Sequence, residues 1–303
     1  VSSTCSHAVQ CCISKKQLVL EDDIVYALKS VKNACEIQCM RHAHIKDAVA
    51  LCSFLHWLEQ KIGKEKLTEC SVADKLQSFR RPIPGLDATL DINELYLVDS
   101  GGQYKEGTTD VTRTVHFSMP TAFEKECFTR VLKGFISIAT CIFPQNTTGA
   151  RLDSFARRAL WDVGLDYRHG TGHGVGCCLN VHEGPQSIGT RIRSEDYLVE
   201  GNIMSDEPGF YSDNKFGIRI ENCIVVVKQK SKYAFYDQDW LTFDQLTLVP
   251  IQAKMIDKTL LNENEISYIN EYHRNVLRIV GEELRKQSKH DVYNWLEINT
   301  KNI

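Results

Sequence analysis

The feature that most constrains this chain is a series of five potential metal ligands placed far apart in the sequence. Two aspartates, one histidine and two glutamates stand in the strings LYLVDSG, GTTDVTRT, HGTGHGVG, SDEPGF and GIRIEN: Asp99, Asp110, His173, Glu207 and Glu221. Such a set can hold two divalent cations side by side, and oxygen-rich ligation with a single His favours Mn, Co or Zn over Ca. Two ions about 3.5–4 Å apart can stabilise a hydrolytic transition state from both sides. A fold for this chain should therefore bring these side chains together.

Paired strands explain how the two aspartates could meet. Asp99 ends the strand-like run 94–99, and Asp110 opens the run 110–117. The Ser-Gly-Gly stretch and Gly107 between the two runs favour a turn. The sequence therefore predicts a hairpin that brings both carboxylates to the same end of a sheet.

The two glutamates follow the same pattern. Pro208-Gly209 turns the chain after Glu207, and the run from Gly217 to Val227 returns as a strand that contains Glu221. His173 lies among glycines at every second position, which allow the backbone to pass close to a site. A second hairpin and a glycine-rich segment would complete the cluster.

Helical periodicity is strongest towards the two ends of the chain. Apolar residues recur every three or four positions in several segments. The expected helices lie at 31–62, 71–79, 121–143, 152–163 and 259–296. A capping-box-like start is read at Ser71-Val-Ala-Asp74, and Gly164 is a natural residue to follow a helix. Residues 165–249 are rich in glycine and strand signals, so the order of segments predicts an α+β fold.

Composition narrows the class of protein. The chain has 303 residues, 43% hydrophobic and 25% charged, which is typical of a globular protein with one large domain or two smaller ones. The net charge of −3 gives no reason to expect binding to nucleic acid or to an anionic membrane. We predict no membrane span and see no signal peptide, so a cytoplasmic location is expected.

The twelve cysteines argue for free thiols rather than a disulfide framework. They include two adjacent pairs, Cys11–Cys12 and Cys177–Cys178, and no CxxC spacing. Reduced and mostly buried thiols are therefore expected, with Cys177 and Cys178 as small packing residues. A zinc site built from cysteines is not expected, because the spacing of its ligands is absent.

Together these strings resemble those of a known family. With NVHEGP, DEPG, AHIKDAVALC and LTLVPIQAKMID, they look most like the Xaa-Pro aminopeptidases (aminopeptidase P) within the creatinase/methionine-aminopeptidase group of metallopeptidases. The resemblance runs from about residue 31 to about residue 290. It implies the pita-bread fold, with antiparallel sheets and covering helices. It also implies a remnant of a preceding domain at 1–30, a metallopeptidase domain at 31–250 and a C-terminal helical extension at 251–303.

The resemblance implies a role for each ligand. Asp99 would hold one metal, His173 and Glu207 would hold the other, and Asp110 and Glu221 would bridge the two. A bridging hydroxide would attack the carbonyl before a proline in the second position of a peptide, releasing the N-terminal residue. The family implies Mn²⁺, with Zn²⁺ or Co²⁺ as alternatives, and a homodimer.

Three further residues receive roles from the same resemblance. His169 and His182 would position the scissile carbonyl and stabilise the tetrahedral intermediate. Arg219 would pair with a ligand carboxylate and orient it. Taken singly, each has a plainer interpretation: a surface histidine beside a glycine loop, a buried partner of a backbone carbonyl, and a solvated strand residue.

The chain departs from the family pattern between Phe79 and Pro82. In the family, a few tens of residues at this point include a strand of the sheet and a histidine that faces the substrate. Here the sequence runs directly on, and no histidine lies between His56 and His116. The resemblance therefore implies that one strand segment is lacking after Arg81, together with that histidine.

Three functions remain open from the sequence. The first is a dinuclear-metal aminopeptidase that acts on peptides with proline second. The second is a non-catalytic pita-bread protein that keeps the metal site without turnover because the strand and histidine are missing. The third is another hydrolase of the same fold, an Xaa-Pro dipeptidase or a methionine aminopeptidase, which the strings GQYKEGTTDVTRT and LTLVPIQAKMID disfavour.

Overall fold

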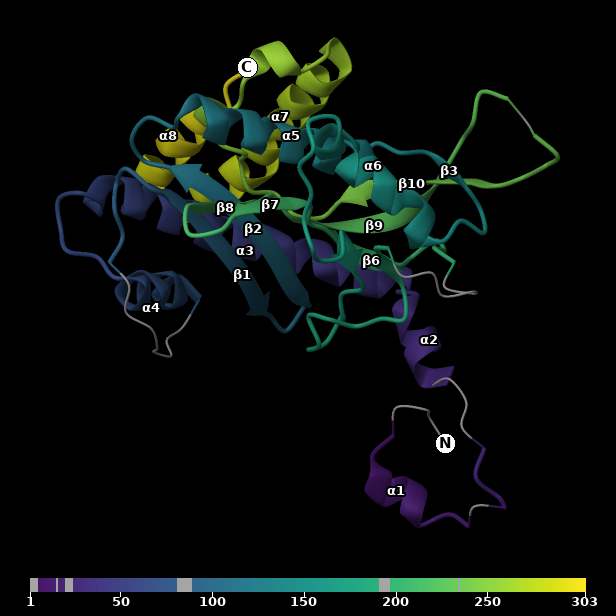
Figure 1. Cartoon of the computed structure of the whole chain (residues 1–303). Helices are drawn as coiled ribbons and strands as arrows, with labels where there is room; N and C mark the ends of the chain where they lie inside the picture. Colours follow the sequence, from purple (N-terminus) through teal and green to yellow (C-terminus); the bar gives the residue numbers. More distant parts are fainter. Residues whose placement is uncertain (1–4, 15, 20–23, 81–88, 191–196, 234) are drawn as a thin grey trace.

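Antiparallel hairpins at the centre of the molecule are covered by long helices (Figure 1). The computed structural model describes residues 5–14, 16–19, 24–80, 89–190, 197–233 and 235–303. The helices are α1 (His7–Cys11), α2 (Ile24–Ser30), α3 (Ala34–Lys61), α4 (Glu69–Arg80), α5 (Ala122–Ala139), α6 (Gly149–Trp161), α7 (Glu263–Lys286) and α8 (His290–Asn299), with 3-10 turns η1 (Ala253–Met255) and η2 (Lys258–Leu260). The strands are β1 (Leu95–Gln103), β2 (Thr108–His116), β3 (Phe143–Pro144), β4 (Gly172–His173), β5 (Ser187–Ile188), β6 (Ile203–Asp206), β7 (Gly209–Ser212), β8 (Phe216–Arg219), β9 (Asn222–Gln229) and β10 (Trp240–Gln245).

The largest sheet has the order β3-β10-β9-β6, and the first five residues of β9 are buried on both faces. Successive residues of β9 point to opposite sides. Cys223 and Val225 pack with Met40 of α3, whereas Ile224 and Val226 pack in a second cluster with residues of α5 and α6. This arrangement explains why the run Cys223-Ile-Val-Val-Val227 is continuously apolar rather than alternating.

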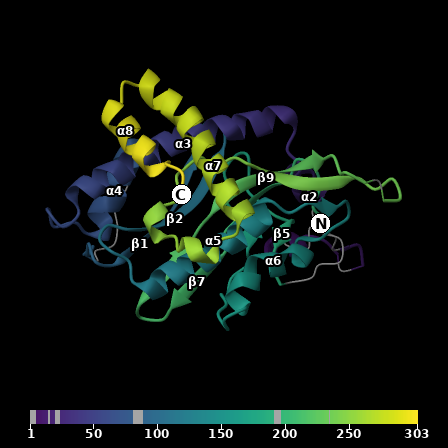
Figure 2. The same ribbon diagram turned by 90° about the horizontal axis from the view of Figure 1, so that it is seen from above.

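The β1–β2 hairpin belongs to a larger core. The strands pair antiparallel from Leu95↔His116 to Gln103↔Thr108, and every residue of β2 is buried. Apolar residues of this hairpin join those of α3, α5, α7 and α8 in one hydrophobic cluster. Figure 2 shows α7 and α8 lying over α3. Within the described residues, no helix is long and apolar enough to cross a membrane.

The α+β class is confirmed, and the helices differ from the expected spans mainly at their ends. Helix α4 begins at Glu69, directly after Thr68. The Thr68 hydroxyl accepts from the Ser71 N–H, and the Ser71 hydroxyl accepts from the Thr68 N–H. The expected start at Ser71 is therefore wrong. Helix α5 ends at Ala139, because Phe143 leaves the helix to pair with Leu241 of β10.

The prediction of one continuous C-terminal helix is wrong. It is two helices, α7 and α8, separated at Gln287–Lys289. Ser288 adopts a φ of 56°, which an α-helix cannot accommodate. The start of α7 is set by a capping box between Asn262 and Glu265.

All twelve cysteines lie within the described residues and are free thiols, as expected. The expectation that most are buried is wrong. Only Cys52, Cys127 and Cys223 are buried, and four are exposed. Helix periodicity identified Cys52 and Cys127 correctly, but it cannot assign an environment to thiols in irregular segments. The strand predicted to be lacking after Arg81 falls at residues 81–88, outside the described residues.

Candidate metal centre

The β1–β2 hairpin places the first two carboxylates on one face. Asp99 lies opposite Thr112, and Asp110 lies opposite Gly101. Residues two apart on a strand share a face, so Asp99 and Asp110 are diagonal neighbours. They do not mark strand ends as expected, because β1 continues to Gln103 and β2 begins at Thr108. The predicted hairpin is confirmed, with both aspartates inside it.

The second pair of carboxylates comes from adjoining strands. Glu207 follows β6, Glu221 precedes β9, and these strands pair through Asp206↔Asn222. The Glu221 N–H donates to the carbonyl of Thr112 at 3.1 Å, which joins this pair to the β1–β2 hairpin. The β7–β8 hairpin spans the chain between the two glutamates, as the turn at Pro208-Gly209 predicted.

His173 is held by close backbone packing. A Cβ at Gly172 would lie 2.0 Å from the Ser205 carbonyl oxygen, and one at Gly174 would lie 1.9 Å from the Glu183 carbonyl oxygen. These positions therefore require glycine, as the alternating glycines suggested. The Nδ1 atom of His173 hydrogen-bonds the Gly174 carbonyl at 3.0 Å. With Nδ1–H donating, Nε2 is the free nitrogen, and it faces the carboxylates.

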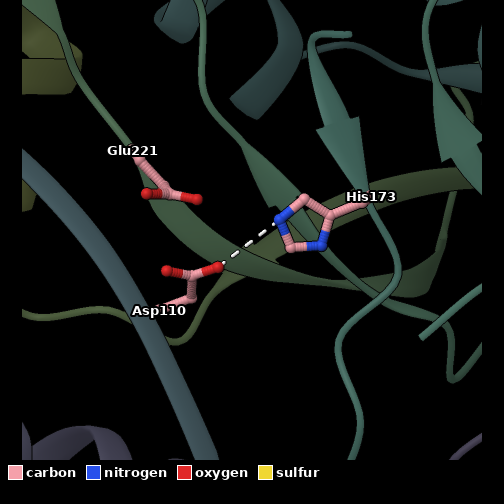
Figure 3. A group of neighbouring side chains, drawn as sticks. All are labelled: Asp110, His173 and Glu221. Atoms are coloured by element: carbon pink, nitrogen blue, oxygen red, sulfur yellow. Dashed lines mark ion pairs between the residues drawn. The ribbon is translucent and has the colours of Figure 1, made fainter. Parts of the chain in front are cut away.

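The ligand atoms converge on one point (Figure 3). One ligand atom each of Asp110, His173 and Glu221 lies within 4.8 Å of the other two. His173 Nε2 is 3.4 Å from Asp110 Oδ2 and 3.4 Å from Glu207 Oε1. Four of the five predicted ligands therefore surround a single volume.

The electrostatics of this cluster fit divalent cations. Burial raises the pKa of Glu221 well above its ordinary range, and the charges of Asp110 and Glu207 raise it further. Burial also raises the pKa of Glu207, against the opposing charges of His173 and Arg219. Buried carboxylates this close together need protons or cations between them. Carboxylate oxygens with one imidazole suit Mn, Co or Zn, so the donor set fits the implied metals.

Asp99 is placed differently from the other four predicted ligands. Its side chain is half-exposed and forms an ion pair with Arg219. Arg219 also donates to the hydroxyls of Tyr211 at 2.7 Å and Thr112 at 3.1 Å. Its Nε atom lies 3.9 Å from Glu207 Oε2. Arg219 therefore contacts two of the predicted ligands, and Asp99 is its ion-pair partner.

The other two predicted histidines lie beside the cluster. The His182 ring is perpendicular to that of His173, with centroids 4.2 Å apart. His169 is linked to Arg219 through Tyr211, whose hydroxyl is 2.9 Å from His169 Nε2. The pKa of His169 is lowered, mainly by burial of its imidazole. A cleft of about 380 Å³ is lined by all five predicted ligands and by His182.

Sequence reasoning missed three hydroxyl residues of the centre. Thr112 donates to Glu221 Oε2 at 2.6 Å, and Ser205 both donates to Glu207 Oε1 at 3.1 Å and accepts from the His173 N–H. Tyr211 joins His169 to Arg219. Thr112 could have been found, because it lies two residues from Asp110 on the same face of β2. For Tyr211 and Ser205 no local signal distinguishes them from ordinary strand residues.

Comparisons with known proteins agree with this geometry. Residues 81–228 match the model of metallopeptidase family M24, and residues 239–303 match the C-terminal region of the same peptidases. Aminopeptidase P2 of Arabidopsis thaliana is 45% identical over 300 residues, covering 90% of this chain and 42% of that protein. A probable Xaa-Pro aminopeptidase P of Talaromyces marneffei is 44% identical over 302 residues, covering 90% of this chain and 46% of that protein. The chain thus spans less than half of these relatives.

Solved structures give the same result. An X-prolyl aminopeptidase from Caenorhabditis elegans, a cytosolic enzyme with a di-nuclear active site, superposes with a TM-score of 0.90 at 40% identity. The match covers 96% of this chain and 51% of that one. Prolidase from Pyrococcus furiosus shares the fold, with a TM-score of 0.63 at 22% identity, over 81% of this chain and 74% of that one.

A pita-bread fold with a buried carboxylate–histidine cluster in its cleft defines a metallopeptidase-type centre. The chain belongs to metallopeptidase family M24. The fold and the family expected from the sequence strings are both confirmed.

The alignments also bear on the residues predicted to be lacking. The alignment with the Arabidopsis relative is 300 positions long but uses 90% of the 303 residues here, which is about 273. About 27 aligned positions of the relative therefore have no counterpart in this chain. This number agrees with the few tens of residues expected to be lacking.

Proposed function

We propose that this chain carries the active site of a metal-dependent aminopeptidase that removes the N-terminal residue from peptides with proline in the second position. The observation that carries the proposal is the convergence of Asp110, His173, Glu207 and Glu221 in one cleft. The relatives named as Xaa-Pro aminopeptidases support the substrate class.

The proposed ligand roles are those that the family resemblance implies. Asp99 would hold one ion, His173 and Glu207 the other, and Asp110 and Glu221 would bridge them. Two divalent ions bound there would lower the pKa of a water molecule towards neutrality and polarise the scissile carbonyl. Mn²⁺ is the proposed metal, and we also propose a homodimer and a cytoplasmic location, the last supported by the cytosolic Caenorhabditis relative.

The chain's own groups would orient the substrate. His182 lines the cleft beside His173, so its imidazole can contact a carbonyl oxygen bound there. His169 is kept in place by its hydrogen bonds to Tyr211 and to the Gly170 carbonyl. A donor placed where negative charge develops stabilises the transition state more than the ground state.

The division into domains at residues 30 and 250 stays a prediction.

The proposal is tested by hydrolysis of Arg-Pro-Pro with added Mn²⁺, alongside a count of bound metal. We expect two ions per chain and release of arginine, with little cleavage of Arg-Ala-Pro as the matched control. A chain that binds no metal would contradict both the centre and the activity. Two bound ions without turnover would contradict the activity and favour a metal-binding protein.

Replacing Tyr211 by phenylalanine should lower kcat/KM for Arg-Pro-Pro roughly tenfold. The substitution removes the hydroxyl that His169 and Arg219 share, while the ring and the metal ligands remain. Steady-state kinetics and a metal count measure the effect. Tyr233→Phe is the control, because Tyr233 is 74% exposed on the β9–β10 hairpin. An unchanged kcat/KM for the Tyr211 variant would mean that the hydroxyl does not orient these groups.

A further inference from the structure

The loop that carries His182 is pinned to the β1–β2 hairpin at its tip. We call residues 176–184 the cleft loop, because four consecutive members line the cleft: Leu179, Asn180, Val181 and His182. The Leu179 N–H donates to Gln103 Oε1 at 3.0 Å, and its carbonyl accepts from the Thr108 hydroxyl at 3.2 Å. These bonds hold the tip, but they do not reach the residues that follow His182.

The other side of the cleft loop is held by a segment remote in sequence. We call residues 24–32, which are α2 and the two residues after it, the strap. Lys29 Nζ lies 2.7 Å from Glu183 Oε2, and Lys32 Nζ lies 3.6 Å from Glu183 Oε1. The Gly184 N–H donates to the hydroxyl of Tyr26 at 2.7 Å. The strap therefore forms ion pairs and a hydrogen bond with the two residues directly after His182.

The strap is itself fixed to the central sheet. The Lys32 N–H donates to the Gly201 carbonyl at 3.0 Å, and the Asn202 side chain donates to the Ser30 carbonyl at 3.1 Å. Val31 forms a β-bridge with Asn202, just before β6. Because β6 leads directly into Glu207, the strap connects the cleft loop to the same strand that supports a predicted ligand.

The ion pairs of Glu183 are formed in a buried environment, where loss of a partner is costly. The side chains of Glu183 and Lys32 are only 2% and 1% exposed. A buried carboxylate that loses its cations is strongly destabilised, so it will move towards any new partner or towards water. In the described part of the chain, both cations within 4 Å of Glu183 come from the strap. Movement of Glu183 would displace the adjoining His182.

We propose that the strap positions His182 over the cleft, with Glu183 as the residue through which it acts. Lys29, Lys32 and Tyr26 are positioning residues in this scheme, since they contact Glu183 and Gly184 rather than the cleft. The structural part of the proposal, that the strap holds the cleft loop in place, does not depend on the proposed function. The catalytic part, that His182 must be held in place for turnover, rests on it.

The test compares Glu183→Gln, Lys29→Met and Tyr26→Phe with the wild-type chain. Hydrogen–deuterium exchange of the cleft loop is measured first, since it needs no activity. We expect loop exchange roughly tenfold faster or more in Glu183→Gln, with exchange in α5 unchanged. Lys286→Met is the matched control, because Lys286 also pairs with a glutamate but lies on α7. Unchanged loop exchange in Glu183→Gln and Tyr26→Phe would overturn the strap.

Kinetics and a metal count then test the link to His182. We expect two ions per chain in every variant, kcat for Arg-Pro-Pro lowered about tenfold in Glu183→Gln, and KM changed much less. Lys29→Arg should keep the wild-type kcat. Faster loop exchange with an unchanged kcat would overturn the positioning role. If the wild-type chain itself shows no turnover, the proposed function fails while the exchange result still decides whether the strap holds the loop.

Discussion

Replacing Glu221 by glutamine should leave the chain unable to hold two divalent ions and lower hydrolysis of Arg-Pro-Pro by roughly a thousandfold. Glutamine is nearly the same size, and its oxygen can still accept the hydrogen bond from Thr112. What is lost is the negative charge beside Asp110 and Glu207. Elemental analysis of the purified variant and steady-state kinetics measure the two effects.

In the absence of metal, the same substitution should stabilise the folded chain at alkaline pH. Glu221 has a raised pKa in the folded state, so the folded chain binds this proton more tightly than the unfolded chain does. Its contribution to stability is therefore present below the ordinary glutamate pKa and is lost as the pH rises through the raised one. Glutamine has no such loss. At pH 8 without metal, the urea midpoint of the variant should exceed that of wild type.

Added Mn²⁺ should reverse this order, because only the wild-type chain gains the stabilisation of two bound ions. Glu282→Gln is the control, since Glu282 is an exposed residue of α7 and should change neither metal content nor activity. Two ions per chain in the Glu221 variant would refute the assignment of this residue as a bridging ligand.

Replacing Arg113 by methionine should cost about 3–5 kcal/mol of unfolding free energy. Arg113 is 1% exposed, and its guanidinium donates to backbone carbonyls on two sides. On one side is Glu221, at 2.7 Å, and on the other are Val249 at 2.7 Å and Pro250 at 3.2 Å. A further bond reaches the hydroxyl of Tyr272 on α7. Methionine fills much of the volume but removes the donor to the buried carbonyls of Glu221 and Pro250. The Val249 carbonyl still accepts from the Tyr272 hydroxyl at 2.8 Å.

Urea denaturation monitored by circular dichroism measures this loss. Arg285→Met is the matched control, because Arg285 is an exposed residue of α7 whose guanidinium lies over the ring of Tyr293. It should cost less than about 1 kcal/mol. Lysine at position 113 should not restore the unfolding free energy, since a single ammonium cannot reach acceptors on both sides. A loss below about 1 kcal/mol for Arg113→Met would show that the donors are replaceable.

The sequence predicted those parts of the fold that depend on short-range signals. Apolar periodicity predicted a helix over 31–62, and α3 spans Ala34–Lys61. The hairpin containing Asp99 and Asp110 follows from alternation and glycines between two adjacent strands. Where a helix end depended on a distant partner, as for Phe143 pairing with β10, the prediction was wrong.

The candidate site divides in the same way. The five predicted ligands and their order were available from the strings alone, and four of them surround one volume. The sequence did not reveal that Asp99 pairs with Arg219, because the two are 120 positions apart. It also did not reveal that Tyr211 connects Arg219 to His169, since a strand tyrosine has no local mark of such a role.

By itself, the sequence determined an α+β chain of antiparallel hairpins and helices whose carboxylates and histidine could form one metal centre. Periodicity, caps and turns act between residues a few positions apart, so they can be read along the chain. Only the tertiary structure decided which groups the centre touches and what holds its loops. Lys29 and Glu183, for example, are 154 positions apart, and packing of the strap against the sheet brings them together. Contacts of this kind depend on the whole fold, and no local pattern specifies them.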